Sequence, residues 1–102
     1  MPFHGHIIGI PDPADTKKSV SGTLREWSVK ERDFTAIDQR IGLVDVGGKI
    51  YRVIICFPAL IDKLYVAAGS TVAADDFILK WIADGESIPY GRAYFRLEPD
   101  DA

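Results

Sequence analysis

The chain has 102 residues, of which 47% are hydrophobic and 26% are charged, and its formal net charge is −3. This length and composition fit one globular domain over residues 1–102 and exclude a disordered, collagen-like or coiled-coil chain. The negative charge gives no overall attraction to nucleic acid or to anionic lipid, so nucleic-acid binding would need a local basic face.

Two features of the sequence bear on where the protein is found. The start, Met1 to His6, lacks the basic residues and the long apolar stretch of a signal peptide. The longest apolar run, Val53 to Phe57, is far shorter than the roughly 18 residues that a membrane-spanning helix requires. The single cysteine, Cys56, cannot form an internal disulfide and is expected to be a small core residue. We therefore expect a cytoplasmic protein with no transmembrane helix.

The first predicted element is a short strand over residues 3–10, which is rich in isoleucine and interrupted by two glycines. Residues 11–19 follow, and their prolines and few apolar side chains predict a surface loop. His4 and His6 would share one face of the strand and could chelate a divalent metal with a third ligand. No Cys or Glu stands at a companion spacing, so we expect two solvated histidines and no metal.

Two structures compete for residues 20–40. A helix is indicated by Thr23 and Glu26, which are spaced as in a capping box, and by the helical spacing of the apolar residues. Two strands, over residues 22–29 and 34–37, fit the same stretch. We favour strands, because Thr, Trp, Ser and Val form helices weakly.

A β-hairpin is predicted over residues 41–57. Gly47 and Gly48 supply the positive φ that a tight two-residue turn requires. The second arm becomes apolar on both faces after Arg52, which indicates a central strand that is covered on both sides. Pro58 is expected to end this strand.

Two short helices are expected after the hairpin. Residues 59–68 place apolar side chains at helical spacing between Pro58, which suits the first helical position, and Gly69, which suits the end. Residues 71–84 show the same spacing, with a charged ladder on another face and Gly85 at the end. The second segment would also make a passable strand, and we favour helix because the charge spacing and the glycine agree with the apolar spacing.

The chain is predicted to end in a strand over residues 90–97 and an acidic, frayed tail over residues 98–102. Successive side chains of a strand point to opposite faces. One set would face the core: Gly91, Ala93, Phe95 and Leu97. The other set would form one outward row: Tyr90, Arg92, Tyr94 and Arg96.

The outward row is the best candidate for a binding site in the sequence. It interleaves aromatic rings with guanidinium groups, which could stack bases and pair with phosphates, or meet an acidic protein surface. Lys49, Tyr51 and Arg52 would extend the row if the hairpin lies beside the last strand. The competing interpretation is an ordinary solvent-facing strand whose tyrosines and arginines cover one another.

The sequence contains no recognisable catalytic set and no cofactor motif. Both histidines are N-terminal, which leaves little material for a hydrolase triad. Trp27 and Trp81 are expected in the core. Four acidic residues are explained by a charged helix face and its ends: Asp75, Asp76, Asp84 and Glu86. We therefore predict no catalytic residue and no cofactor.

These elements predict an α+β or mainly β fold, with a small antiparallel sheet or a partly open barrel of about five strands and one or two short helices. The order of the elements resembles the oligonucleotide-binding fold, in arrangement only.

The sequence is compatible with three functions. The first is a non-catalytic module that binds a protein partner, as an inhibitor, an immunity protein or a complex subunit. The alternatives are a single-stranded nucleic-acid-binding domain and a small enzyme with an unrecognised site. No membrane partner is expected, and homo-oligomerisation through an exposed strand edge is left open.

Overall fold

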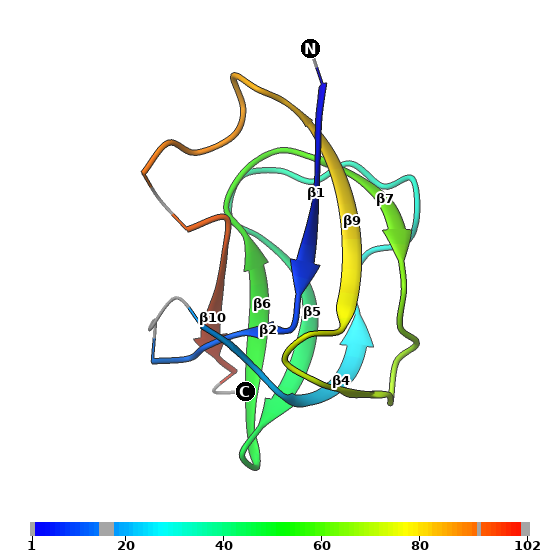
Figure 1. Cartoon of the computed structure of the whole chain (residues 1–102), viewed down its shortest axis with the longest axis vertical. Coiled ribbons are helices and arrows are strands. Elements are labelled where there is room, and N and C mark those ends of the chain that lie inside the picture. Colours follow the sequence, from blue (N-terminus) through cyan, green and yellow to red (C-terminus); the bar gives the residue numbers. More distant parts are fainter. Residues whose placement is uncertain (1, 15–17, 92, 101–102) are drawn as a thin grey trace.

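The computed structural model describes residues 2–14, 18–91 and 93–100. Within these residues the chain forms ten β-strands and no helix, arranged in three antiparallel sheets (Figure 1). The fold is therefore mainly β, one of the two predicted classes, and none of the sheets closes into a barrel. The strands are β1 (Pro2–Ile8), β2 (Ile10–Pro11), β3 (Ser19–Val20), β4 (Gly22–Trp27), β5 (Gln39–Val46), β6 (Lys49–Ile55), β7 (Leu60–Leu64), β8 (Thr71–Val72), β9 (Phe77–Asp84) and β10 (Phe95–Pro99).

The five-stranded sheet has the order β10-β6-β5-β4-β8 and is built around the predicted hairpin. The turn residues Gly47 and Gly48 have φ angles of 63° and 85°, a left-handed region that glycine adopts without steric cost. β6 lies between β5 and β10, and its residues Val53, Ile54 and Ile55 are buried. The hairpin and its central second arm are therefore confirmed.

The three-stranded sheet has the order β1-β9-β7, with β9 in the middle. Strand β1 confirms the predicted N-terminal strand, which ends where Gly9 turns the chain with a φ of 69°. Gly5 lies opposite Trp81 of β9, and a β-carbon at Gly5 would overlap the indole ring. The absence of a side chain at this position therefore lets β1 lie against the buried tryptophan.

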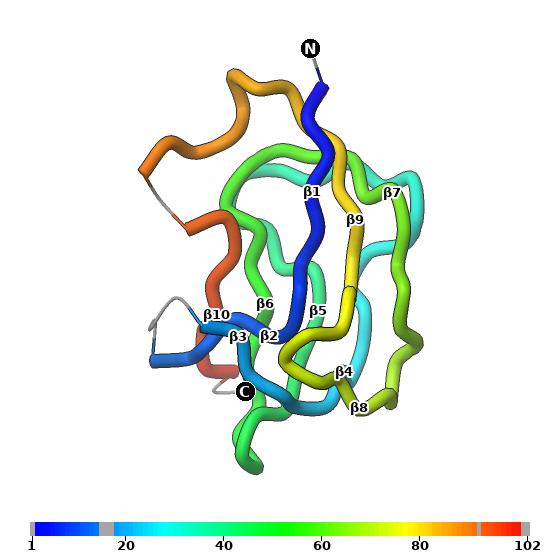
Figure 2. Tube along the Cα trace, in the orientation of Figure 1, coloured from blue at the N-terminus to red at the C-terminus, as the bar shows by residue number. Residues whose placement is uncertain are grey.

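The predicted surface loop covers residues 11–19, of which residues 15–17 lie outside the described part of the chain, and its two ends pair as the ribbon of β2 and β3. Ile10 pairs with Val20, and Pro11 pairs with Ser19. This ribbon leads the chain from the three-stranded sheet into the five-stranded sheet (Figure 2).

The two larger sheets enclose one hydrophobic core, to which both contribute buried side chains (Figure 1). Phe57, only 1% exposed, joins the sheets: its ring centroid lies 4.8 Å from that of Trp81 and 6.0 Å from that of Phe95. Trp27 packs half-buried against the core, and its Nε1 donates a hydrogen bond of 2.9 Å to the Val66 carbonyl. Both tryptophans therefore belong to the core, as predicted.

The first predicted helix is a strand. Residues 59–68 contain β7, which pairs with β9 through Leu60 and Ile82. Ile61 points into the core and is 0% exposed. The helical spacing of the apolar residues was misleading, because one edge of β9 is open to pairing and β7 occupies it.

The second predicted helix is also strand, as β8 and β9. β9 has a neighbouring strand on each side, and Leu79, Trp81 and Ala83 alternate into the core with the period of a strand. The expected charge ladder does not form, because Lys80 pairs instead with Asp62 across the sheet at 3.4 Å. Within the described residues, no helix could cross a membrane.

Strand β4 confirms the strand interpretation of residues 22–29. The strand predicted over residues 34–37 is wrong: Phe34 makes only an isolated bridge to Leu60. The physical reason is that Thr35 turns inward and is buried. Its hydroxyl lies within hydrogen-bond distance of the Phe57 and Ala59 main-chain carbonyls, to which it donates.

The last strand begins later than predicted. β10 starts at Phe95, and Gly91 has a φ of 74°, which is outside the extended region. Phe95 and Leu97 pack against the core as predicted, whereas Gly91 and Ala93 are exposed. The strand continues to Pro99 in register with β6, so the first residues of the predicted frayed tail are paired.

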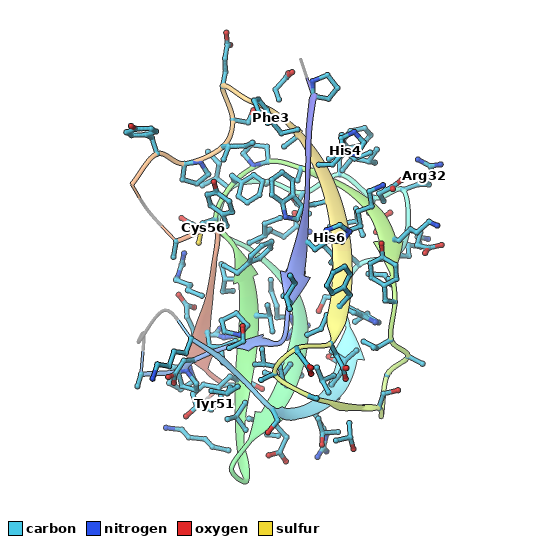
Figure 3. All side chains as sticks on the ribbon, viewed as in Figure 1. Phe3, His4, His6, Arg32, Tyr51 and Cys56 are labelled. Atoms are coloured by element: carbon cyan, nitrogen blue, oxygen red, sulfur yellow. The ribbon has the colours of Figure 1, made fainter. Side chains whose placement is uncertain are left out.

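Cys56 is not a core residue, contrary to the prediction. It follows the last residue of β6 and is half-buried. Figure 3 shows Cys56 and Tyr51 at opposite ends of β6. The residues on either side of Cys56, Ile55 and Phe57, are both buried, so the cysteine alone turns away from the core.

Candidate functional site

The structure describes three members of the predicted outward row, which are Tyr90, Tyr94 and Arg96. Tyr90 is fully exposed in the loop before β10. The Tyr94 ring instead lies edge-on to two core rings, with centroid distances of 5.5 and 5.9 Å. Arg96 lies on the outer face of β10, and Arg92 lies outside the described residues. Tyr94 and Arg96 both line the groove that is described below, whereas Tyr90 is fully exposed in the loop.

Arg96 is held by carboxylates of the same chain. Its Nη1 donates to Asp38 at 2.7 Å, and its Nε and Nη2 donate to Glu98 at 3.0 and 2.9 Å. Nη1 also donates to the Cys56 Sγ at 3.2 Å. Asp38 first, and Glu98 second, raise the pKa of Arg96 further above its ordinary value, so the guanidinium stays charged. A phosphate would have to displace these carboxylates to reach it.

The hairpin lies beside the last strand, which is the arrangement that the sequence analysis required for an extended face. Arg52 stands opposite Glu98, and the two side chains form an ion pair of 3.5 Å. Tyr51 stands opposite Pro99 and packs against the core, with the Lys49 ammonium 5.5 Å from its ring centroid. Only Arg52 therefore joins Arg96 on the outer face. We call the group Arg52, Arg96, Asp38 and Glu98 the ion-pair network.

An aromatic cluster at the three-stranded sheet consists of His6, which Figure 3 labels on β1, and of Tyr65 and Phe77. The His6 ring centroid lies 4.8 Å from that of Phe77 and 5.9 Å from that of Tyr65. The Tyr65 hydroxyl lies 3.4 Å from the His6 Nε2. Tyr65 and Phe77 nevertheless remain 43% and 49% exposed. Neighbouring exposed apolar side chains of this kind mark contact sites on soluble proteins.

A groove of about 990 Å³ separates the edges of the two larger sheets. One side is β1, from His6 to Ile8, and the opposite side runs from Ala93 into β10 as far as Leu97. A third side is the ribbon of β2 and β3 with the adjoining loop residues, and it is lined by Pro11, Asp12, Pro13, Lys18 and Ser19. β1 is the end strand of one sheet and β10 is the end strand of the other (Figure 1). Two sides of the groove are therefore edges of the larger sheets, and the third is the ribbon of β2 and β3, whose strand β2 lies close to β10.

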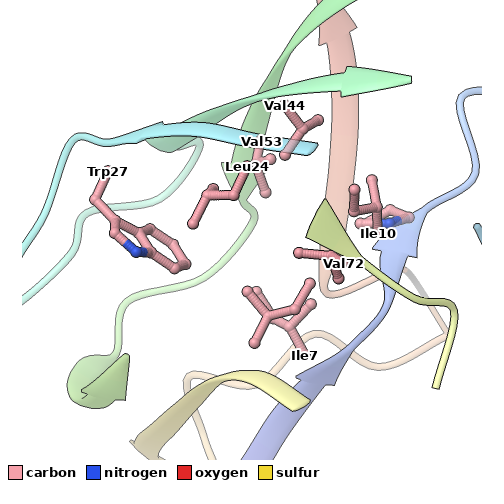
Figure 4. Close-up of a pocket in the computed structure, with 9 residues that line it drawn as sticks. Ile7, Ile10, Leu24, Trp27, Val44, Val53 and Val72 are labelled. Atoms are coloured by element: carbon pink, nitrogen blue, oxygen red, sulfur yellow. The ribbon is translucent and has the colours of Figure 1, made fainter. Parts of the chain in front are cut away.

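A second, much smaller space of about 10 Å³ lies within the core (Figure 4). Its lining is apolar and includes Ile7, Leu24, Trp27 and Val72. This volume is at the lower limit for one water molecule, and a buried water needs polar partners that the lining does not offer. The space is a small packing gap of the core.

The described residues contain no group of three or more His, Cys, Asp and Glu side chains that could hold a metal ion. His4 and His6 are both exposed on β1, and the ring of His6 belongs to the aromatic cluster. Asp76 has a local structural role, since its carboxylate accepts a hydrogen bond from the Ala73 main-chain N–H at 2.9 Å. Asp75, Asp84 and Glu86 are exposed.

The groove and the aromatic cluster were not predicted from the sequence. Both depend on the pairing of β1 with β9, which joins the start of the chain to a segment near its end. The available signal was the alternation of His4, His6 and Ile8 on one face of the first strand.

Comparisons with protein-family models, with curated proteins and with solved structures found no match.

Proposed function

We propose that this chain is a non-catalytic protein-binding module and that its partner docks in the groove between β1 and β10. The observation that carries the proposal is that two sheet edges line this groove and neither pairs with a further strand in the described part of the chain. A sheet edge presents main-chain donors and acceptors with which another protein chain can pair.

The surroundings of the groove support a protein partner. His6 belongs both to the groove wall and to the aromatic cluster, so ring surface continues from the groove over β1. Tyr90 is fully exposed in the loop that leads to β10. Tyrosine is favoured as an interface anchor because it combines a large apolar ring with a polar end.

Groove-blocking variants test this proposal. Ala93 is exposed and lines the groove, so Ala93→Trp would obstruct it beside β10 without replacing a core side chain. Ala68 is equally exposed but lies in the loop between β7 and β8, and Ala68→Trp is the matched control. Each variant is immobilised and exposed to native lysate. We expect wild type and Ala68→Trp to retain the same proteins, and Ala93→Trp to lose them. Equal retention by all three proteins would place the binding site elsewhere.

The predicted row has its own test. If Tyr94 and Arg96 take part in partner binding, Tyr94→Ala and Arg96→Ala will each weaken retention in the same assay, with circular dichroism to check the fold. Retention that is unchanged in both folded variants would remove this row from the binding site.

Single-stranded nucleic acid is the second candidate partner, and one observation favours it. The pairing of β6 with β10 brings Arg52 beside Arg96. Both guanidinium groups already contact Glu98, at 3.5 and 2.9 Å, which weakens their attraction for phosphate. We expect fluorescence titration with short DNA and RNA oligonucleotides at low ionic strength to detect no salt-sensitive binding. Clear salt-sensitive binding would favour this second candidate over the first.

A further inference from the structure

We infer that the groove receives an extended segment of a partner protein as an added β-strand, hydrogen-bonded to β1 on one side and to β10 on the other. This inference rests on the proposed function and names the form in which the partner binds.

The β10 edge has main-chain groups that point into the groove. The Cys56 N–H donates to the Tyr94 carbonyl, and the Asp100 N–H donates to the Ile50 carbonyl, so both of these pairs are hydrogen-bonded. Hydrogen-bonded and non-bonded pairs alternate along an antiparallel ladder. Phe95 and Leu97 therefore direct their N–H and C=O groups away from β6, toward the groove that they line.

The β1 edge is oriented in the same way. The Tyr65 N–H donates to the Ile78 carbonyl, so Ile78 directs its carbonyl toward the β7 side of β9. The main-chain N–H and C=O of Leu79 therefore point toward β1, where Leu79 pairs with Ile7. The neighbours of Ile7, which are His6 and Ile8, direct their main-chain groups away from β9. The Ser19 hydroxyl bears this out, since it donates a hydrogen bond of 2.6 Å to the Ile8 carbonyl.

The directions of the two strands suit one inserted strand. β1 and β10 both run downward in Figure 1, so a segment that runs upward between them is antiparallel to both. Antiparallel pairing is slightly more stable per residue than parallel pairing. The facing stretches, His6 to Ile8 and Ala93 to Leu97, have room for a segment of about four residues. Its inward side chains would meet Phe95 and Leu97, which are half-buried against the core.

The ends of both edges are blocked, which confines pairing to the groove. Pro99 near the end of β10 and Pro2 at the start of β1 have no main-chain N–H to donate. Ser19 occupies the Ile8 carbonyl at the other end of β1. Edge strands are protected in this way against unwanted pairing. Among the positions between these blocks, His6 on β1 and Phe95 and Leu97 on β10 line the groove.

The chemistry of the groove favours a polypeptide over a nucleic acid. Its open main-chain groups form an alternating series of donors and acceptors, which an extended peptide matches and a phosphate backbone does not. Arg96 lies at the groove with its charge held by Asp38 and Glu98, so it offers little to a phosphate.

Peptide selection tests the inference. A phage-displayed library of random dodecapeptides is selected on the immobilised full chain, and the enriched peptides are screened against Ala93→Trp and Ala68→Trp. We expect the selection to yield peptides that bind wild type and Ala68→Trp but do not bind Ala93→Trp. One such peptide is then synthesised with a single N-methyl group at each position in turn, and its affinity is measured by fluorescence anisotropy.

A strand that bridges two edges uses the N–H of every central residue, alternately toward β1 and toward β10. N-methylation should therefore weaken binding by roughly threefold to tenfold or more at each successive central position. Loss at alternate positions only would mean pairing with a single edge and would overturn the inference. Loss at no position would mean docking through side chains and would overturn it equally.

The failure of this inference is distinguishable from the failure of the proposed function. If selection yields no groove-dependent peptide while lysate proteins still depend on Ala93, the partner binds the groove in another form and only the inference falls. If neither peptides nor lysate proteins respond to Ala93→Trp, both fall. If analytical ultracentrifugation shows a dimer that Ala93→Trp dissociates, the occupant is a second copy of the chain, which also overturns the inference.

Discussion

The outer surfaces of the two larger sheets differ in whether their side chains are paired within the chain or exposed. On the five-stranded sheet, the ion-pair network joins two arginines to two carboxylates of the same chain, at 2.7 to 3.5 Å. On the three-stranded sheet, the rings of the aromatic cluster contact one another and remain largely exposed. The charges of the first surface are neutralised within the chain, whereas the rings of the second remain partly exposed.

This difference shows why residue type alone does not tell how a charged side chain is used. An arginine attracts an anion only to the extent that its own chain has not already supplied one. The sequence places Arg96 next to tyrosines, but the fold places it next to Asp38 and Glu98. The groove lies between these two surfaces, and it is lined by edges of both sheets.

The largest effect is expected where the two sheets are joined. Phe57→Ala should lower the free energy of unfolding by about 3–5 kcal/mol, because the buried ring contacts Trp81 on one sheet and Phe95 on the other. Urea denaturation followed by tryptophan fluorescence measures this. Phe34→Ala is the matched control, since Phe34 is 78% exposed and its loss should change stability by less than about 0.5 kcal/mol. Similar losses in the two variants would mean that Phe57 does not hold the sheets together.

The next effect concerns the three-stranded sheet alone. Gly5→Ala should destabilise the fold by about 1–3 kcal/mol, because the new methyl group overlaps the Trp81 indole. The same substitution in a Trp81→Leu background should cost much less, since the overlapping ring has been removed. A double-mutant cycle from urea denaturation measures this coupling. Additive losses would show that β1 does not pack on Trp81 as described.

These contacts also show what the sequence could and could not predict. The hairpin was predicted because its turn and both arms are local: Gly47 and Gly48 require one geometry, and the apolar run of β6 requires cover on both sides. β7 and β9 were mistaken for helices, because apolar residues at helical spacing also fit a strand. Only the pairing of β9 with β1 and β7 decides between the two, and such distant pairing is not encoded in a local pattern.

The candidate site was predictable only in part. Phe95 and Leu97 were correctly assigned inward because strand alternation is a local property. The partners of Arg96 were not predicted, since Asp38 comes from a distant loop and reaches Arg96 only in the folded chain. The groove could not be predicted at all, because it is formed by two strands from opposite ends of the sequence.

A smaller effect is expected in the aromatic cluster. Phe77→Ala should lower the free energy of unfolding by about 0.5–1.5 kcal/mol, because it removes ring contacts with His6 and Tyr65 from a half-exposed position. Thermal denaturation followed by circular dichroism measures the loss, and Phe34→Ala again provides the exposed control. If the cluster serves partner binding, Phe77→Ala will weaken partner retention more than it weakens the fold. A loss above that of Phe57→Ala would mean that these rings belong to the core.

The smallest effect is expected in the ion-pair network. Arg96→Gln should cost at most about 1 kcal/mol, because the Arg96 side chain is 41% exposed and water screens its ion pairs. Lys63→Gln removes the same charge from an exposed position on β7 and is the matched control. The difference between the two variants should shrink as the salt concentration rises. Thermal denaturation at low and high salt measures it.

Salt rather than the titration of Arg96 should govern this contribution. The carboxylates raise the pKa of Arg96, so the folded chain holds the proton more tightly than the unfolded chain. A raised pKa gives stability that is present below the unfolded value and lost only as the pH rises through the folded one, in strongly alkaline solution. Arg96 itself should therefore cause no change in stability between about pH 5 and 9. A loss in Arg96→Gln that persists at high salt would instead indicate that the Arg96 side chain acts by packing, as a long side chain that covers the sheet.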